Sequence, residues 1–167
     1  NLLGNYQGSG GVSSALKPAQ TVAADISLFY ANKTSDPWNY SYALTLSNIS
    51  GKVTYGGSEK NFIPTNLRMG MAATHEIDEL NKLTFTVDFN KLMVPTPPAF
   101  ENGKIVGTDP ATVSAIGGIF GSLFDAPDGI SEEIKEVTTS VGAEYLFNNS
   151  FALRTGYFHE SEMKGNR

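Results

Sequence analysis

The chain contains no cysteine among its 167 residues, which excludes disulfide bonds and thiolate metal sites. It has no run of 18 consecutive apolar residues, and this excludes a transmembrane helix. Its basic residues form no cluster and its formal net charge is −5, so it lacks the electrostatic footprint of a nucleic-acid-binding protein. Charged residues make up 17% of the chain, whereas soluble domains average about 25%. The chain therefore has few charges with which to cover a water-facing surface.

Patterns of catalytic and metal-binding residues are also missing. His75 precedes Glu76, but no second histidine follows four residues later, so the zinc-protease pattern fails. The glycine-rich stretch 8–11 lacks the spacing of a nucleophile elbow. Asp125 and Asp128 lack the alternating oxygen ligands and terminal glutamate of a calcium loop. We therefore expect a protein that is not an enzyme and that uses no cofactor or metal.

The sequence does contain a repeated segment of about ten residues, the length of a tilted strand that crosses a bilayer. In each copy, apolar or aromatic side chains alternate with small polar ones, and this period of two predicts a β-strand. The copies cover residues 22–30, 40–47, 67–74, 83–90, 140–147 and 151–157. The residues predicted to face lipid are Ile26, Leu28, Leu44, Leu46, Met69, Met71, Phe85, Val87, Val141 and Leu153.

The polar positions favour a membrane β-barrel. A half-buried soluble sheet usually turns lysine and glutamate toward water, whereas here these positions hold mostly serine, threonine, alanine, glycine and asparagine. Such a face suits a confined lumen, and the apolar face would then meet lipid. Spanning strands must close into a barrel because a bilayer cannot satisfy an open strand edge. The alternative is a soluble β-sandwich with its apolar face inside, as in a secreted binding module.

The lengths of the predicted connections support the barrel independently. The connections around 33–37, 77–82 and 148–150 are short, whereas those around 50–66 and 94–136 are long. Short and long connections therefore alternate, as in outer-membrane barrels with short periplasmic turns and long external loops. The Gly- and Ser-rich stretch 2–17 is predicted to be another external loop.

These features predict an all-β fold, namely a transmembrane antiparallel β-barrel segment of six or seven strands. The smallest single-chain outer-membrane barrels have eight strands. We therefore expect residues 1–167 to form a single segment of a larger outer-membrane barrel domain, with an external helical loop over about 94–136.

Two charged residues are predicted to pair inside the barrel. Phe147 and Phe151 bracket the turn 148–150, and pairing them across the hairpin places Glu144 directly opposite Arg154. Both would point inward, as a salt bridge in the lumen or as a polar gate. The salt bridge is the favoured interpretation because unpaired buried charges are costly.

The long loop is predicted to contain a helix. Asp109 followed by Pro110 resembles an N-cap and first helical position, and Pro127–Gly129 ends the apolar pattern. A second, acidic helical turn starts at Ser131. The apolar residues recur at helical spacing, at Val113, Ile116, Ile119, Phe120, Leu123 and Phe124. This helix would either dock onto another protein or close the barrel mouth as a lid.

Three stretches resemble a known family. The run from Asn61 to Gly70 resembles the Pro-x-x-Leu-Arg-x-Gly strand entry of FadL-like barrels. The run from Tyr42 to Tyr55 resembles a strand and loop of the PorV family within that group, as do Thr84–Met93 and their proline-rich exit. The resemblance covers residues 21–167. It implies a barrel of fourteen strands in the bacterial outer membrane, within the type IX secretion system.

The resemblance also implies partners. Members of this family associate with an SprA-like translocon barrel, receive cargo through its C-terminal signal domain, and pass it to a PorU-like attachment protein. The leading hypothesis is therefore a non-enzymatic outer-membrane subunit that binds the translocon or cargo through its external loops, surrounded by outer-membrane lipid. The alternative is a FadL-like channel for hydrophobic small molecules, which would need an apolar lumen.

Overall fold

The structure is a computed structural model that describes residues 18–32, 36–55, 60–96, 99–101, 104–106, 109–126 and 129–162. The external loop predicted at 2–17 lies outside these ranges. Neither helix in the described part has the length and apolar content that crossing a bilayer requires.

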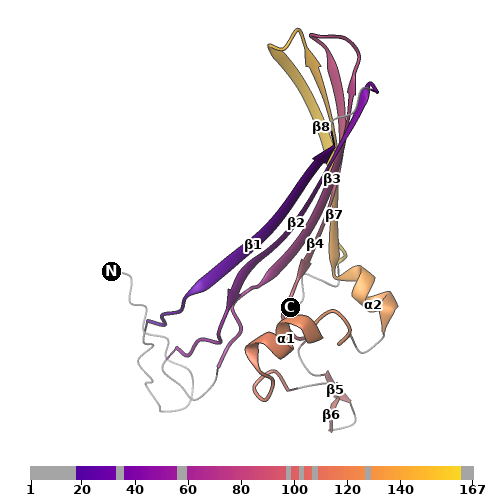
Figure 1. The fold of residues 1–167 in the computed structure, drawn as a ribbon. Helices are drawn as coiled ribbons and strands as arrows, with labels where there is room; N and C mark the ends of the chain where they lie inside the picture. Colours follow the sequence, from indigo (N-terminus) through magenta and orange to yellow (C-terminus); the bar gives the residue numbers. More distant parts are fainter. Residues whose placement is uncertain are drawn as a thin grey trace.

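The predicted strands form a single curved antiparallel sheet (Figure 1). Its strands, in spatial order, are β1 (Ala23–Asn32), β2 (Trp38–Ser50), β3 (Asn66–Glu76), β4 (Lys82–Leu92), β7 (Val137–Phe147) and β8 (Phe151–His159). The all-β prediction and its six strands are confirmed within the described ranges, and β1 and β8 form the two edges of the sheet. Outside the sheet lie the hairpin β5 (Ala99–Glu101) and β6 (Lys104–Val106), and the helices α1 (Ala115–Gly121) and α2 (Ile130–Lys135).

The register places the predicted lipid-facing residues on one face of the sheet. Leu28 lies opposite Leu44, which lies opposite Met69 on the next strand. Val87 likewise lies between Met71 and Val141. Little of the described part of the chain covers the face: Leu28 is 66% exposed and Leu153 is 64% exposed. That lipid covers it stays a prediction.

The opposite face is small, polar and hydrogen-bonded from strand to strand. Thr74 and Thr84 approach to 3.0 Å between their hydroxyls, and Asn66 donates to Asn90 at 2.5 Å. Glu144 lies directly opposite Arg154, whose Nε donates to the Glu144 carboxylate. Arg154 and Glu144 thus form an ion pair on the polar face, and that this face lines a lumen stays a prediction.

A bulge in β2, the longest strand, keeps the apolar face of the sheet continuous. The register with β1 shifts between Ala24 and Ile26, so that two residues of β2 lie opposite Asp25. One of them, Asn48, adopts a left-handed φ of 58°, which asparagine tolerates better than most residues. Its backbone N–H donates to Asp25 Oδ1 at 2.7 Å. The extra residue lets Ile49 lie opposite Ala24, on the same face as Leu46.

Short and long connections lie at opposite ends of the sheet. Figure 1 shows α1, α2 and the β5–β6 hairpin at the end away from the short turns after β3 and β7. The two short turns bond to each other: Asn149 N donates to Leu80 O at 2.8 Å, and Asn148 N donates to Asn81 Oδ1 at 3.1 Å. The predicted alternation of connection lengths therefore places the short turns, bonded to each other, at one end of the sheet and the long connections at the other end.

Asp78 organises the turn between β3 and β4. Its Oδ1 accepts the backbone N–H groups of Leu80 and Asn81 at 2.8 Å each, and the Asn81 side chain donates to both carboxylate oxygens. The side-chain hydrogen bond from Asn81, followed by the one from the Leu80 N–H, holds the pKa of Asp78 below its ordinary value of 3.8.

We predict that acid loosens this turn at a pH below 3.8, the ordinary pKa of an aspartate. Because the folded turn lowers the pKa of Asp78, its contribution to stability is complete above that value and is lost as pH falls through the lower pKa of the folded state. The amide chemical shifts of Leu80 and Asn81 should titrate with that lower midpoint. The Asp78→Asn variant should show no such titration, and a wild-type midpoint at or above 3.8 would contradict the prediction.

Candidate partner-binding surface

The two long connections pack together as one unit, which we call the cap. It consists of the described parts of the β2–β3 connection (residues 51–65) and of the β4–β7 connection (residues 93–136). Lys52 joins them: its ammonium donates to the Pro110 carbonyl at 2.5 Å and lies 4.6 Å from the centre of the Phe62 ring. The same ammonium also donates to the Ala111 carbonyl at 3.3 Å. The cap is thus a composite of two segments that are distant in sequence.

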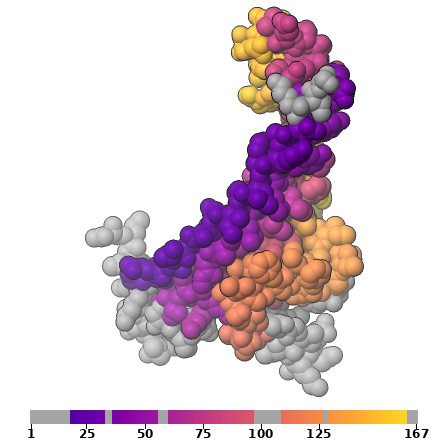
Figure 2. Space-filling model, viewed as in Figure 1, coloured from indigo at the N-terminus to yellow at the C-terminus, as the bar shows by residue number. Residues whose placement is uncertain are grey.

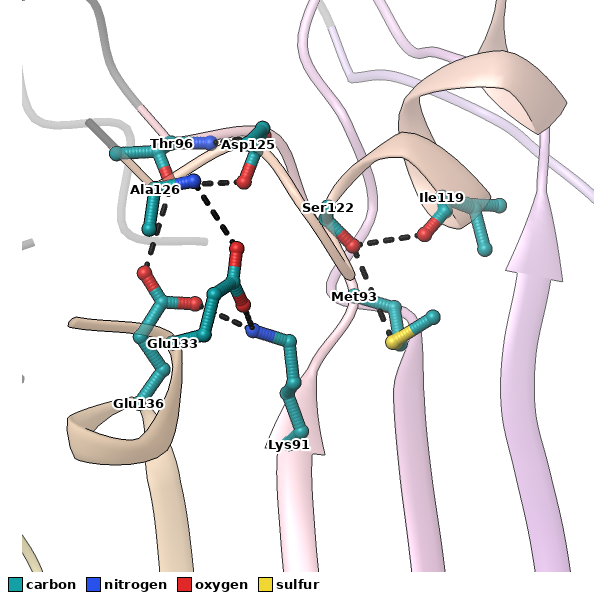
Figure 3. Close-up of polar contacts among 9 residues, drawn as sticks. All are labelled: Lys91, Met93, Thr96, Ile119, Ser122, Asp125, Ala126, Glu133 and Glu136. Carbon is teal, nitrogen blue, oxygen red and sulfur yellow. Dashed lines mark hydrogen bonds and ion pairs between the residues drawn. The ribbon is translucent and has the colours of Figure 1, made fainter. Parts of the chain in front are cut away.

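A small core holds the cap to the end of β4. Met93 directly follows that strand and is 1% exposed, and Ile119 of α1 is 2% exposed. Ser122 Oγ donates to the Ile119 carbonyl at 2.7 Å and lies 3.9 Å from Met93 Sδ (Figure 3). Gly118 is buried so closely against Phe62 and Pro95 that a side chain there would collide with both. This core fixes the orientation of α1.

Helix α1 is shorter than the sequence predicts. Its N-cap is Ser114, whose hydroxyl accepts the Gly117 N–H at 3.0 Å, and not Asp109. The Asp109 carboxylate accepts the Ala111 N–H at 2.8 Å and closes a separate turn, so its capping capacity is already used.

The helix also ends earlier than predicted, at Gly121 and not near Pro127. Downstream of it, Asp125 accepts the backbone N–H of Thr96 at 2.9 Å, which draws the chain out of the helical path. The glycines of α1 have low helix propensity and favour this early end. The second predicted helical turn, from Ser131, is confirmed as part of α2.

The run that leaves β4 folds back onto the strand end. Pro95 lies against α1, where its Cγ would meet a side chain at position 118. The backbone and hydroxyl of Thr96 bond the Asp125 carboxylate, at 2.9 and 3.1 Å. The start of the connection therefore anchors the helix that follows it.

An ionic cluster joins α2 to β4. Lys91 donates to the carboxylates of Glu133 and Glu136, the latter at 2.6 Å (Figure 3). The three side chains are 9%, 12% and 6% exposed in that order. Glu133 Oε1 also accepts the Ala126 N–H at 3.0 Å, and Thr96 Oγ1 approaches Glu136 Oε1 at 3.4 Å. The carboxylates are therefore well hydrogen-bonded in their buried position.

The outer surface of the cap is apolar. Figure 2 shows α1 and α2, in orange, together on the visible face. Large apolar side chains of this surface are strongly exposed, with Phe124 at 87% and Ile130 at 78%. We call these residues the apolar stripe: Ile116, Phe120, Phe124, Ile130 and Ile134. Large apolar side chains exposed in this way often mark a contact site.

The stripe differs in part from the predicted helix face. Ile116, Phe120 and Phe124 are exposed as a docking role requires, whereas Ile119 is turned inward and Val113 and Leu123 are half-buried. The sequence prediction missed Ile130 and Ile134. These two residues follow Gly129 and are four positions apart, which is a helical spacing. The Glu144–Arg154 pair lies in the half of the sheet toward the β7–β8 turn and takes no part in the stripe.

Comparison with known proteins identifies the first half of the chain. The family model described as type IX secretion system protein PorV matches residues 6–99. The match covers β1 to β4 and the first segment of the cap, and it extends over more than half of the 167 residues. No curated protein matches the chain.

We predict that Gly118→Ala loosens the cap. A Cβ at this position would lie 2.4 Å from Phe62 Cζ and 2.9 Å from Pro95 Cγ, so the two connections must separate. Overpacking of this kind costs about 1–3 kcal/mol. Amide hydrogen exchange in α1 should accelerate accordingly.

Gly121→Ala is the matched control, because nothing lies within 4 Å of the added Cβ. Replacing this helical glycine should leave α1 unchanged or stabilise it by up to about 1 kcal/mol. Equal effects of the two substitutions on α1 would show that the contact of Gly118 with Phe62 and Pro95 does not hold the cap.

Proposed function

The chain belongs to the PorV family of type IX secretion system proteins, and we propose that its sheet is part of a closed β-barrel in the bacterial outer membrane. The exposed apolar face supports this placement, since large residues such as Leu28, Met71 and Tyr157 are 66%, 49% and 67% exposed. In water such a face would be an aggregation hazard, whereas in a bilayer it is the required lipid contact.

Barrel closure follows from the membrane placement. Among the described residues, no strand pairs with the outer side of β1 or of β8, and the hydrocarbon core cannot satisfy the backbone groups of an open edge. Further strands must therefore continue the sheet from both edges until it closes. We propose a FadL-like barrel of fourteen strands, of which this chain contributes six.

We further propose that the barrel is a non-enzymatic interaction subunit. The cap would lie outside the cell and bind a protein partner of the secretion system through the apolar stripe. The supporting observation is that the stripe is exposed although the helices beneath it are held in place by buried contacts of Ile119, Lys91 and Glu136. A preorganised apolar surface loses less conformational entropy on binding than a mobile loop. The proposed partners are an SprA-like translocon barrel, the cargo C-terminal signal domain and a PorU-like attachment protein.

The position of the cap favours docking over closure of the barrel mouth. Lys91 lies on β4 opposite Leu67 and Val137, in the rows of the apolar face. Because Glu133 and Glu136 bind this side chain, the cap is attached on the apolar side of the sheet, which would be the outward side of the proposed barrel. A neighbouring protein in or above the membrane would meet it there.

The same faces argue against a channel for hydrophobic molecules. The inward face consists mostly of small polar residues and contains the ion pairs Arg68–Asp88 and Glu144–Arg154. The apolar exceptions on this face are Phe29, Leu146 and Phe158. An apolar solute would meet a polar wall along most of this path.

We predict that the double variant Ile116→Ser/Phe120→Ser folds normally but binds its secretion partner more weakly. The two side chains are 66% and 56% exposed, so the cap core does not depend on them. Burying each at an interface is worth about 1.5–3 kcal/mol, so partner affinity should fall by at least about tenfold. The measurement is co-purification of the translocon barrel from outer membranes, together with secretion of cargo.

Ile77→Ser/Leu80→Ser is the matched control, because these residues are 51% and 48% exposed at the opposite end of the sheet. It should leave co-purification and secretion unchanged. If the cap variant assembles, co-purifies and secretes like wild type, the stripe is not the docking surface.

A further inference from the structure

Lys91 occupies a position that the strand pattern reserves for an apolar side chain. It follows Phe85, Val87 and Phe89 at alternate positions of β4, and its register partners are Leu67 and Val137. Nevertheless it is only 7% exposed. A buried charge requires compensation by partners and hydrogen bonds, so this lysine needs α2 in its observed place.

The negative charge around Lys91 exceeds what is needed to compensate one lysine. Glu133 and Glu136 both bond its ammonium, and Asp125 lies in the same hydrogen-bonded cluster through Thr96. Two carboxylates therefore contact one positive charge, and a third lies in the same hydrogen-bonded cluster. Without Lys91, the two glutamates would remain close together, poorly hydrated and mutually repulsive.

Apolar packing contributes little to holding α2, which has no buried residue of its own. Among the described residues, the buried apolar side chains of the cap are Val53, Met93, Ile119 and Ala126. The five residues of the apolar stripe remain outside. The docked position of α2 thus depends more on the ionic cluster than on hydrophobic burial.

We propose that Lys91, Glu133 and Glu136 form a charge latch that holds α2 against the end of β4, and that breaking the latch frees α2 while the sheet stays intact. The latch lies at the end of a strand, where β4 finishes at Leu92. Its loss therefore leaves the strand ladder between β3, β4 and β7 untouched. The inference concerns the position of the cap alone and does not depend on any partner.

The test is amide hydrogen exchange of the whole barrel that contains this chain, in lipid vesicles, comparing wild type with Lys91→Met. Methionine suits the apolar register, but it removes the positive charge that Glu133 and Glu136 share. The protection of the Ile134, Lys135 and Glu136 amides should fall about 100-fold, because removing one partner of a buried ion pair is strongly destabilising. The amides of β3 and β4 should keep their wild-type protection. Lys91→Arg, which keeps the positive charge, should retain most of the protection of α2.

Lys82→Met is the matched control. It is the same substitution on the same strand, and it breaks a partly exposed pair in which Lys82 Nζ lies 3.7 Å from Glu76 Oε1. The protection of α2 should not change. A further variant, Lys91→Met/Glu133→Gln/Glu136→Gln, removes the repulsion and should recover part of the protection lost in Lys91→Met.

Two results would overturn the proposal. Unchanged protection of α2 in Lys91→Met would show that apolar packing alone holds the cap. Loss of protection throughout β3 and β4 in that variant would show that Lys91 supports the sheet and is not a latch. If α2 is freed but the sheet stays protected, the latch is established.

Discussion

The alternation of side chains with a period of two is the constraint on which the rest of this structure depends. It divides each strand between an apolar face and a small polar face, and a slip of one residue would exchange the two. The register preserves this division across all six strands of the described sheet. Where β2 needs an extra residue, Asn48 adopts a left-handed conformation so that Ile49 returns to the apolar face.

Antiparallel order then determines where function can reside. Each short turn sends the chain back to the opposite end of the sheet, so both long connections lie at that end and combine into the cap. Lys52 and Lys91 attach this unit, one to carbonyl groups of the other connection and one to the carboxylates of α2. The cap buries few large apolar side chains, chiefly Met93 and Ile119, and leaves the five residues of the apolar stripe on the outside. Family membership in the type IX secretion system gives that exposed surface a proposed purpose.

The strands were predictable because their signal is local, and so was the pairing of Glu144 with Arg154 across a three-residue turn. The cap was not, because its contacts join residues far apart in sequence. Asp109 has the sequence signature of an N-cap, but its carboxylate closes a separate turn. Ser114 caps the helix instead. Nothing local distinguishes Ile119, which is buried by Met93, from Phe120, which is exposed. Lys91 interrupts the apolar pattern of β4, and the partners that explain it, Glu133 and Glu136, lie more than forty residues further along the chain.

The central claim is that the two faces of the sheet meet lipid and a polar interior. A spin-label scan tests it most directly, and the absence of cysteine from the chain makes each introduced label unique. Labels at Ile26, Leu44, Met69, Phe85 and Leu153 should collide with oxygen dissolved in the bilayer, whereas labels at Thr45, Thr86 and Ser140 should collide with a water-soluble relaxer. This account predicts that accessibility alternates with a period of two along every strand. Inverted accessibility, or no alternation, would contradict it.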